Sequence, residues 1–123
     1  MNQPVTRDRN NNSEVIMMDM EDVLYIQTED GAVVFHTPEG SFYPLIPSLS
    51  MYAKHTEALG FEKLDRTNLV NMKKVKEFDL KHGLVYFEEQ ISSNSRSQSA
   101  IVAFMNIGKL KEMIMTWIER NTK

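Results

Sequence analysis

Short apolar runs separated by turn signals occupy much of this chain and restrict it to a fold built mainly from β-strands. Residues 23–26 and 32–36 form two such runs, and they flank a segment that contains the dipeptide Asp30-Gly31. An Asp-Gly pair between apolar runs is typical of a two-residue hairpin turn, because glycine adopts positive φ angles at little cost. We therefore predict an antiparallel hairpin at this position.

Two further turns continue the β pattern. Residues 38–40 lead into a strand predicted for residues 41–45, which contains Pro44. Proline has no N–H to donate to a sheet, so this strand should lie at an edge or end at Pro44. The runs 75–79 and 84–88 flank Leu-Lys-His-Gly and predict a third hairpin.

Two segments depart from the β pattern and predict helices. Ser48 can cap a helix of about ten residues that ends at Gly60. Apolar residues at helical spacing predict a second, longer helix over residues 100–119. The buried stripe of the first helix would consist of Leu49, Tyr52, Ala53 and Leu59. The expected fold is mostly β, with one short central helix and a C-terminal helix.

The length and composition fit one globular domain. Residues 1–13 are polar and rich in asparagine, which predicts a disordered tail, and residues 14–123 would form the domain. The chain has no cysteine, which excludes disulfides and cysteine-based zinc sites and favours a reducing cytoplasm. It has no run of about 18 apolar residues and no apolar leader, so we expect no membrane partner.

Charge is unevenly distributed along the chain. The net charge is −3, but residues 1–60 hold three Lys or Arg and nine Asp or Glu, whereas residues 61–123 hold eleven and eight. A nucleic acid responds to the local charge within a Debye length of about 8–10 Å, and not to the total. The acidic total therefore does not exclude DNA as a partner.

Basic and small polar side chains alternate in residues 61–75. A backbone that presents such groups to one side suits contact with phosphates. The alternatives without a binding role are that Arg66 pairs with Asp65 or Glu62 and that the lysines form a solvated face. Asn71 is expected to bond the local backbone. The candidate contacts in the stretch include Lys63, Arg66, Thr67 and Lys73.

Residues 61–71 read Phe-Glu-Lys-Leu-Asp-Arg-Thr-Asn-Leu-Val-Asn. This run resembles a motif of the LytTR-type DNA-binding domain, the output module of many bacterial response regulators. The family pattern is Phe, any residue, Arg, an apolar residue, His, Arg or Lys, Ser, an aromatic residue, an apolar residue, Val and Asn. Here Lys63, Arg66 and Thr67 stand at the two basic positions and the Ser position, and Val70-Asn71 match directly.

Shorter segments extend the resemblance over about residues 18–114. Residues 22–26 and 33–37 are similar to the family's first two strands, and Ser95-Arg96 is similar to a Ser-Arg pair that follows a later hairpin. About 20 residues precede the first matched strand, which is too few for the receiver domain that the family usually carries ahead of this module. We therefore expect a stand-alone regulator.

The resemblance implies stacked antiparallel β-sheets whose loops enter two successive major grooves of double-stranded DNA. Arg66 and Arg96 would lie on separate recognition loops, where arginine can bind O6 and N7 of guanine. Lys63, Thr67 and Lys73 would support them at phosphates. The expected function is sequence-specific regulation of bacterial transcription, by a homodimer or by copies that bind side by side on DNA.

Departures from the family pattern support an alternative function. Asp65 replaces the usual His, the loop at residues 29–31 is acidic, and Asn68 replaces an aromatic residue. The alternative is a β-rich protein-interaction module that has lost DNA binding and uses a Met-rich surface. No nucleophile motif or metal-ligand spacing is present in the sequence, so we expect no enzyme activity, cofactor or metal.

Overall fold

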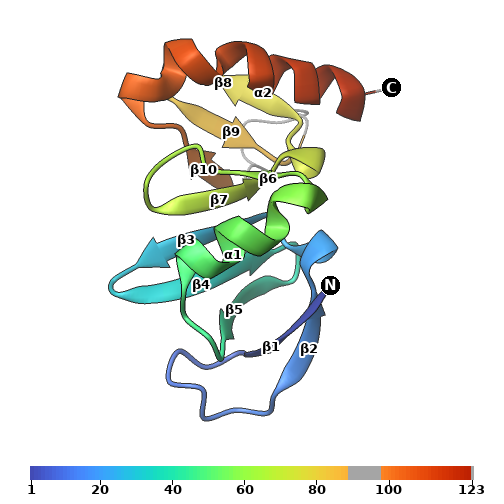
Figure 1. The fold of residues 1–123 in the computed structure, drawn as a ribbon, viewed down its shortest axis with the longest axis vertical. Coiled ribbons are helices and arrows are strands. Elements are labelled where there is room, and N and C mark those ends of the chain that lie inside the picture. The colour runs from blue at the N-terminus through green and yellow to red at the C-terminus, as the bar shows by residue number, and fades with distance from the viewer. Residues whose placement is uncertain (89–97, 123) are drawn as a thin grey trace.

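The computed structural model of the chain describes residues 1–88 and 98–122, in which two antiparallel sheets are stacked (Figure 1). The larger sheet has seven strands in the order β2-β1-β5-β4-β3-β7-β6, and the smaller has three in the order β10-β9-β8. These two sheets and two α-helices confirm the predicted fold class. The strands of the larger sheet are β1 Asn2–Thr6, β2 Ile16–Asp19, β3 Tyr25–Glu29, β4 Ala32–Thr37, β5 Gly40–Pro44, β6 Phe61–Glu62 and β7 Asn68–Asn71. The smaller sheet contains β8 Glu77–Asp79, β9 Leu84–Tyr86 and β10 Ser99–Ile101.

The helices cover different parts of the stack. Helix α1, Leu49–Thr56, lies against the larger sheet, and α2, Ile107–Asn121, lies across the smaller one (Figure 1). Short 3-10 turns link several elements; they are η1 Met20–Asp22, η2 Glu57–Leu59, η3 Met72–Lys74 and η4 Phe104–Asn106. Within residues 1–88 and 98–122, no helix has both the length and the hydrophobicity that a membrane-spanning segment requires.

Local turn chemistry produced the predicted hairpins. Asp30 and Gly31 both have positive φ angles, 49° and 82°, as a two-residue hairpin between β3 and β4 requires. The hairpin between β8 and β9 also forms. Strand β5 ends at Pro44 as predicted, although β5 pairs with β1 and is not an edge strand.

The first helix follows its predicted signals. The Ser48 hydroxyl accepts a hydrogen bond of 3.2 Å from the Met51 N–H, which caps α1. Gly60, with φ of 94°, ends the 3-10 turn η2 that continues the helix. Tyr52 is fully buried and its ring meets that of Phe35 edge to face at 5.2 Å. The central helix is therefore fixed by its two caps and its buried face.

Residues 2–6 correct the prediction of a disordered tail over residues 1–13. They form β1, which pairs with β2 on one side and β5 on the other. Val5 and Thr6 are fully buried. Pairing fills what would be an open edge of β5, and this gain outweighs the polar composition of the segment.

The second helix begins later than predicted. Residues 100–101 belong to β10, where Ala100 pairs with Val85 of β9. Ala100 and Val102 are buried while Ile101 is half-exposed, which is the period of a strand. The helix starts only at Ile107, after η4.

Two clusters of buried side chains form the core. One lies between α1 and the larger sheet, and the other lies between the sheets and α2. Ile114, fully buried, anchors α2 to the second cluster. The two sheets are thus held in a fixed relation, which determines where their connecting loops lie.

Candidate nucleic-acid interface

The loop between β6 and β7, residues 63–67, carries the central part of the motif. It lies on the same side of the molecule as the turn between β3 and β4 and the start of α2 (Figure 1). We call residues 63–67 the recognition loop. Its backbone is bonded on both sides: Thr28 N–H donates to the Thr67 carbonyl at 2.9 Å, and Ala103 N–H donates to the Leu64 carbonyl at 3.0 Å.

Asn68 ties the recognition loop from within. Its side chain is fully buried. The Oδ1 atom accepts from the N–H groups of Leu64, at 3.3 Å, and Asp65, at 3.0 Å. The amide group donates to the Ile101 carbonyl at 2.8 Å. One buried side chain therefore couples the loop to the end of β10.

Asp65 and Thr67 brace the tip of the loop. The Asp65 Oδ2 atom accepts from the Thr67 hydroxyl at 2.5 Å and from the Thr67 N–H at 3.0 Å. The same hydroxyl accepts from the Gln27 amide at 2.8 Å. The hydrogen bond from the Thr67 hydroxyl is the main cause that holds the pKa of Asp65 below its usual range, and the Arg66 charge contributes. The carboxylate is thus engaged within the loop.

Arg66 projects from this braced loop into solvent. It is exposed, and within residues 1–88 and 98–122 its guanidinium pairs with no carboxylate, neither Asp65 nor Glu62. Lys63 is also exposed on the loop. A guanidinium on a rigid backbone loses little freedom when it binds, which favours recognition.

Lys73 does not join Arg66. Lys73 follows β7, whereas Arg66 precedes that strand. The Lys73 ammonium group pairs with Glu21 at 3.5 Å. The neighbouring Met72 carbonyl accepts from Asn121 at the far end of α2. That helix is about 22 Å long, so Lys73 lies far from the side that holds the recognition loop. Arg96, the second predicted recognition residue, lies outside the described residues.

Asn71 has a structural role as predicted, but only its Oδ1 bonds the local backbone, whereas its amide group bonds a distant part of the chain. It is 1% exposed, its amide donates to the Val23 carbonyl at 3.0 Å, and its Oδ1 accepts from the Lys73 N–H. These bonds fix the end of β7 to the chain before β3. The second half of the motif therefore holds the sheet together.

Basic side chains contact the acidic hairpin turn that lies beside the recognition loop. Glu29 pairs with His36, and the Asp30 carbonyl accepts a hydrogen bond from the Arg9 guanidinium. Arg9 is exposed. A basic side chain from the β1–β2 connection therefore accompanies the acidic turn.

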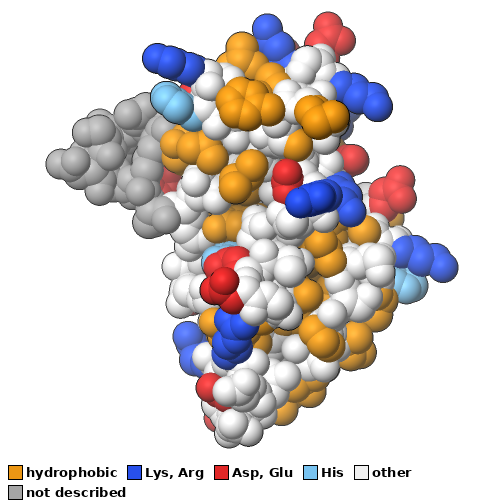
Figure 2. Space-filling view, turned by 90° about the vertical axis from the view of Figure 1, so that its left-hand side faces the viewer, with side chains coloured by type: hydrophobic (Ala, Val, Ile, Leu, Met, Phe, Trp, Pro, Cys, Tyr) orange, Lys and Arg blue, Asp and Glu red, His pale blue; other side chains and the backbone are white. Residues whose placement is uncertain are grey.

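Sequence reasoning missed two residues beside Arg66. Phe104 and Met105 in η4 are 79% and 95% exposed. They line an open groove of about 720 Å³ together with Arg66 and His82. Figure 2 looks onto this side and shows hydrophobic side chains gathered there among basic ones. The sequence does show two large apolar residues at this position, but the prediction assigned them to a helix over residues 100–119.

Exposed methionines occur at separate places in the described residues. Met17 lies on β2 at one end of the molecule, whereas Met105 and Met115 lie beside and on α2 at the other (Figure 1). Met20 and Met72 are fully buried in the two core clusters. Several methionines are thus core residues, which removes part of the basis for the alternative function.

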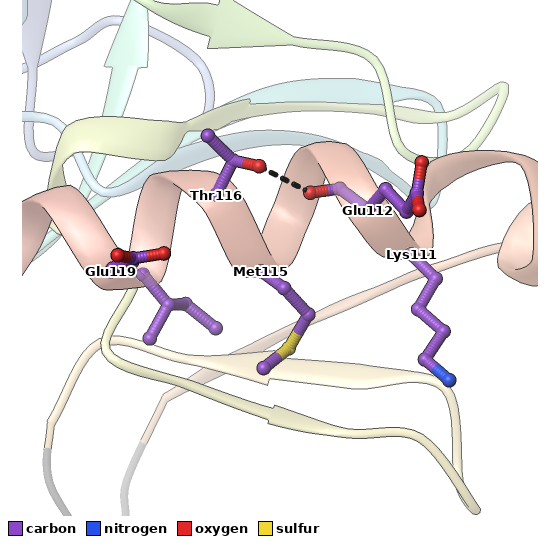
Figure 3. A pocket seen from close by; sticks show the side chains of 6 residues that line it. Lys111, Glu112, Met115, Thr116 and Glu119 are labelled. Atoms are coloured by element: carbon purple, nitrogen blue, oxygen red, sulfur yellow. Dashed lines mark hydrogen bonds between the residues drawn. The ribbon is translucent and has the colours of Figure 1, made fainter.

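A second depression lies on the outer surface of α2 (Figure 3). Its lining comes from that helix alone, and the Thr116 hydroxyl donates back to the Glu112 carbonyl at 2.8 Å. An open dip between turns of one helix offers few converging groups. The part of the chain that the structure describes also contains no cluster of three or more His, Asp or Glu side chains suited to a metal.

The fold and the braced loop define a small β-rich domain with an exposed basic group on one side (Figure 1). The family model of the LytTr DNA-binding domain matches residues 13–115, so the chain belongs to the LytTR family of DNA-binding domains. This membership confirms the resemblance seen in the sequence. No curated protein matches the chain.

A solved structure has the same fold. It is the LytTr DNA-binding domain of a protein named as a methyl-accepting/DNA response regulator from Bacillus cereus. The two structures superimpose with a TM-score of 0.66 at 12% sequence identity, over 92% of this chain and 96% of that chain. At this identity the likeness establishes the fold.

Proposed function

We propose that this chain is a sequence-specific, double-stranded DNA-binding regulator of bacterial transcription, and that the recognition loop is its principal DNA contact. The observation that carries the proposal is the exposed Arg66, which pairs with no carboxylate of the described residues and lies on a loop braced by Asn68 and Asp65. Such a guanidinium can bind O6 and N7 of guanine in the major groove, which discriminates by about 1–3 kcal/mol.

The other loop residues have supporting roles in this proposal. Lys63 would hold a phosphate, which sets the register of the protein on the duplex without reading sequence. The Thr67 hydroxyl already bonds Asp65 and Gln27, so its contribution to DNA binding is to keep the loop in shape. Lys73, paired with Glu21, would contribute a weaker phosphate contact from the far end of β7.

Salt dependence tests whether the chain binds DNA through phosphates. Binding to a mixed pool of duplexes is measured at about 50 and 200 mM salt, and a protein that contacts several phosphates weakens steeply over this range. Absence of binding at the lower salt would favour the protein-interaction module instead. Sedimentation of the protein with and without a selected duplex would show whether two copies bind as a dimer or only side by side.

A matched pair of variants tests the role of Arg66. Arg66→Ala and Lys73→Ala each remove one exposed basic group, one from either end of β7. On a site selected from random duplexes, Arg66→Ala should weaken binding and relax the preference at one base pair. Lys73→Ala should weaken all sequences slightly and alike. Equal, uniform losses would remove Arg66 from the base-reading role.

A further inference from the structure

The exposed apolar residues of η4 share a groove with Arg66. Phe104 and Met105 are 79% and 95% exposed, and Ile101, which also lines the groove, is 51% exposed. Single apolar residues are common on protein surfaces, but a contiguous group that lines a groove marks an interaction site more often. The group lies beside the recognition loop, within the same groove.

The position of this apolar group relative to Arg66 is fixed by the backbone. Ala103 N–H donates to the Leu64 carbonyl, and the Asn68 amide donates to the Ile101 carbonyl. Val102 is buried, and its N–H donates to the Gly83 carbonyl at 2.8 Å. The chain that leads into η4 is therefore anchored, and Ile107, which follows η4, packs against the second core cluster. A surface that engages Arg66 would meet Phe104 and Met105 in a constant geometry.

Size and charge identify the occupant of the groove. The apolar area of two or three side chains is on the order of a few hundred Å², below the roughly 800 Å² per partner in a standard protein interface. The groove also holds the exposed cation of Arg66, while the Asp65 carboxylate bonds Thr67. A polyanion that carries small apolar groups fits this surface. Duplex DNA does, because each thymine presents a methyl group in the major groove.

We propose that Phe104 and Met105 read thymine methyl groups in the major groove, next to the base pair that Arg66 contacts. This inference rests on the proposed DNA-binding function and adds a second, apolar element of sequence recognition to it. The single turn η4 can enter a major groove about 12 Å wide together with the loop. The site would then combine a guanine with one or more adjacent thymines.

Replacing thymine with deoxyuridine tests the contact, because it removes only the methyl group. A duplex selected by the wild-type protein is prepared with single substitutions at each thymine. We expect the wild-type affinity to fall about three- to fivefold at one or two thymines, as the loss of one buried methyl group predicts. Phe104→Ala or Met105→Ala should bind the thymine duplex more weakly and lose this sensitivity.

Two controls separate this inference from the proposed function. Met115→Ala, at a half-exposed position on the outer face of α2, should keep both affinity and methyl sensitivity. Arg66→Ala should bind more weakly but still distinguish thymine from deoxyuridine. If the Phe104 and Met105 variants keep the methyl sensitivity, the inference is overturned while the function stands. If the Phe104 and Met105 variants bend the duplex less than the wild-type protein does, these side chains act as a wedge between base steps. That result would also overturn the inference that they read methyl groups. If Arg66→Ala also has no effect on DNA binding, the proposed function itself fails.

Discussion

Replacing Asn68 with alanine is expected to destabilise the domain and loosen the recognition loop. The substitution removes three hydrogen bonds, to the N–H groups of Leu64 and Asp65 and to the Ile101 carbonyl. Each such bond contributes about 1 kcal/mol net, and buried groups left without partners cost more. We therefore expect a loss of about 2–4 kcal/mol in the free energy of unfolding.

Urea denaturation followed by circular dichroism measures this loss directly, and for a chain of this length it corresponds to a fall in Tm of roughly 6–20 °C. Asn12→Ala is the matched control, because Asn12 is exposed and should change stability by less than about 0.5 kcal/mol. A loss below about 1 kcal/mol for Asn68→Ala would refute the assignment of Asn68 as the buried tie of the loop.

The same variant separates shape from charge in DNA binding. Asn68→Ala keeps Arg66 and Lys63, so the dependence of affinity on salt should stay as in the wild type. The affinity itself should fall, because a looser loop must be ordered on binding. A variant that binds as tightly as the wild type, well below its Tm, would show that bracing of the loop does not matter for recognition.

Four further substitutions test the structure at other positions. Gly60→Ala should cost about 1–2 kcal/mol in urea denaturation, because φ is +94° and the new Cβ would lie 3.3 Å from the Lys73 Cγ; an unchanged midpoint would contradict this. Ile114→Ala should cost about 2–5 kcal/mol and its neighbour Met115→Ala under about 1, and equal costs would show that α2 is not anchored as described. The pKa of Asp65 is lower in the folded protein, so its contribution to stability is complete above about pH 4 and disappears as the pH falls through the folded value. As the pH is lowered from 5 to below the folded pKa of Asp65, the free energy of unfolding should therefore fall less for Asp65→Asn than for the wild type. If the free energy of unfolding depends on pH identically in both proteins, the Asp65–Thr67 bond is excluded as a source of stability.

The local elements of the fold could be predicted from sequence because their causes are local. Asp30-Gly31 specifies its hairpin through two positive φ angles, and Ser48 and Gly60 mark the two ends of the central helix. Each signal acts over only a few residues. Such signals predicted the presence and type of most elements.

The elements that were predicted wrongly depend on distant partners. Residues 2–6 become a strand because β2 and β5 flank them. Residues 100–101 become a strand because β9 lies beside them, although the apolar spacing also fits the helix that follows. Pairing of this kind is determined by tertiary structure and overrides local propensity.

The candidate site was predictable in part for the same reason. Arg66 was identified from residue type, and its exposure agrees with the role proposed for it. Thr67 and Lys73 are residue types that can bind phosphates. In the folded chain, however, the Thr67 hydroxyl bonds Asp65 within the loop, and Lys73 lies beyond the other end of β7, where it pairs with Glu21. Neither fact can be read from the sequence. The groove at Phe104 forms only where η4 meets the recognition loop.

The most direct test of the account maps the DNA-binding surface itself. Amide signals of the ¹⁵N-labelled protein are followed by NMR while a selected duplex is added. We predict that the largest shifts occur in residues 63–67 and 101–106, with little change around Met115 on the outer face of α2. Shifts concentrated on α2, or no shifts at low salt, would contradict the claim that the braced loop of Arg66 binds DNA.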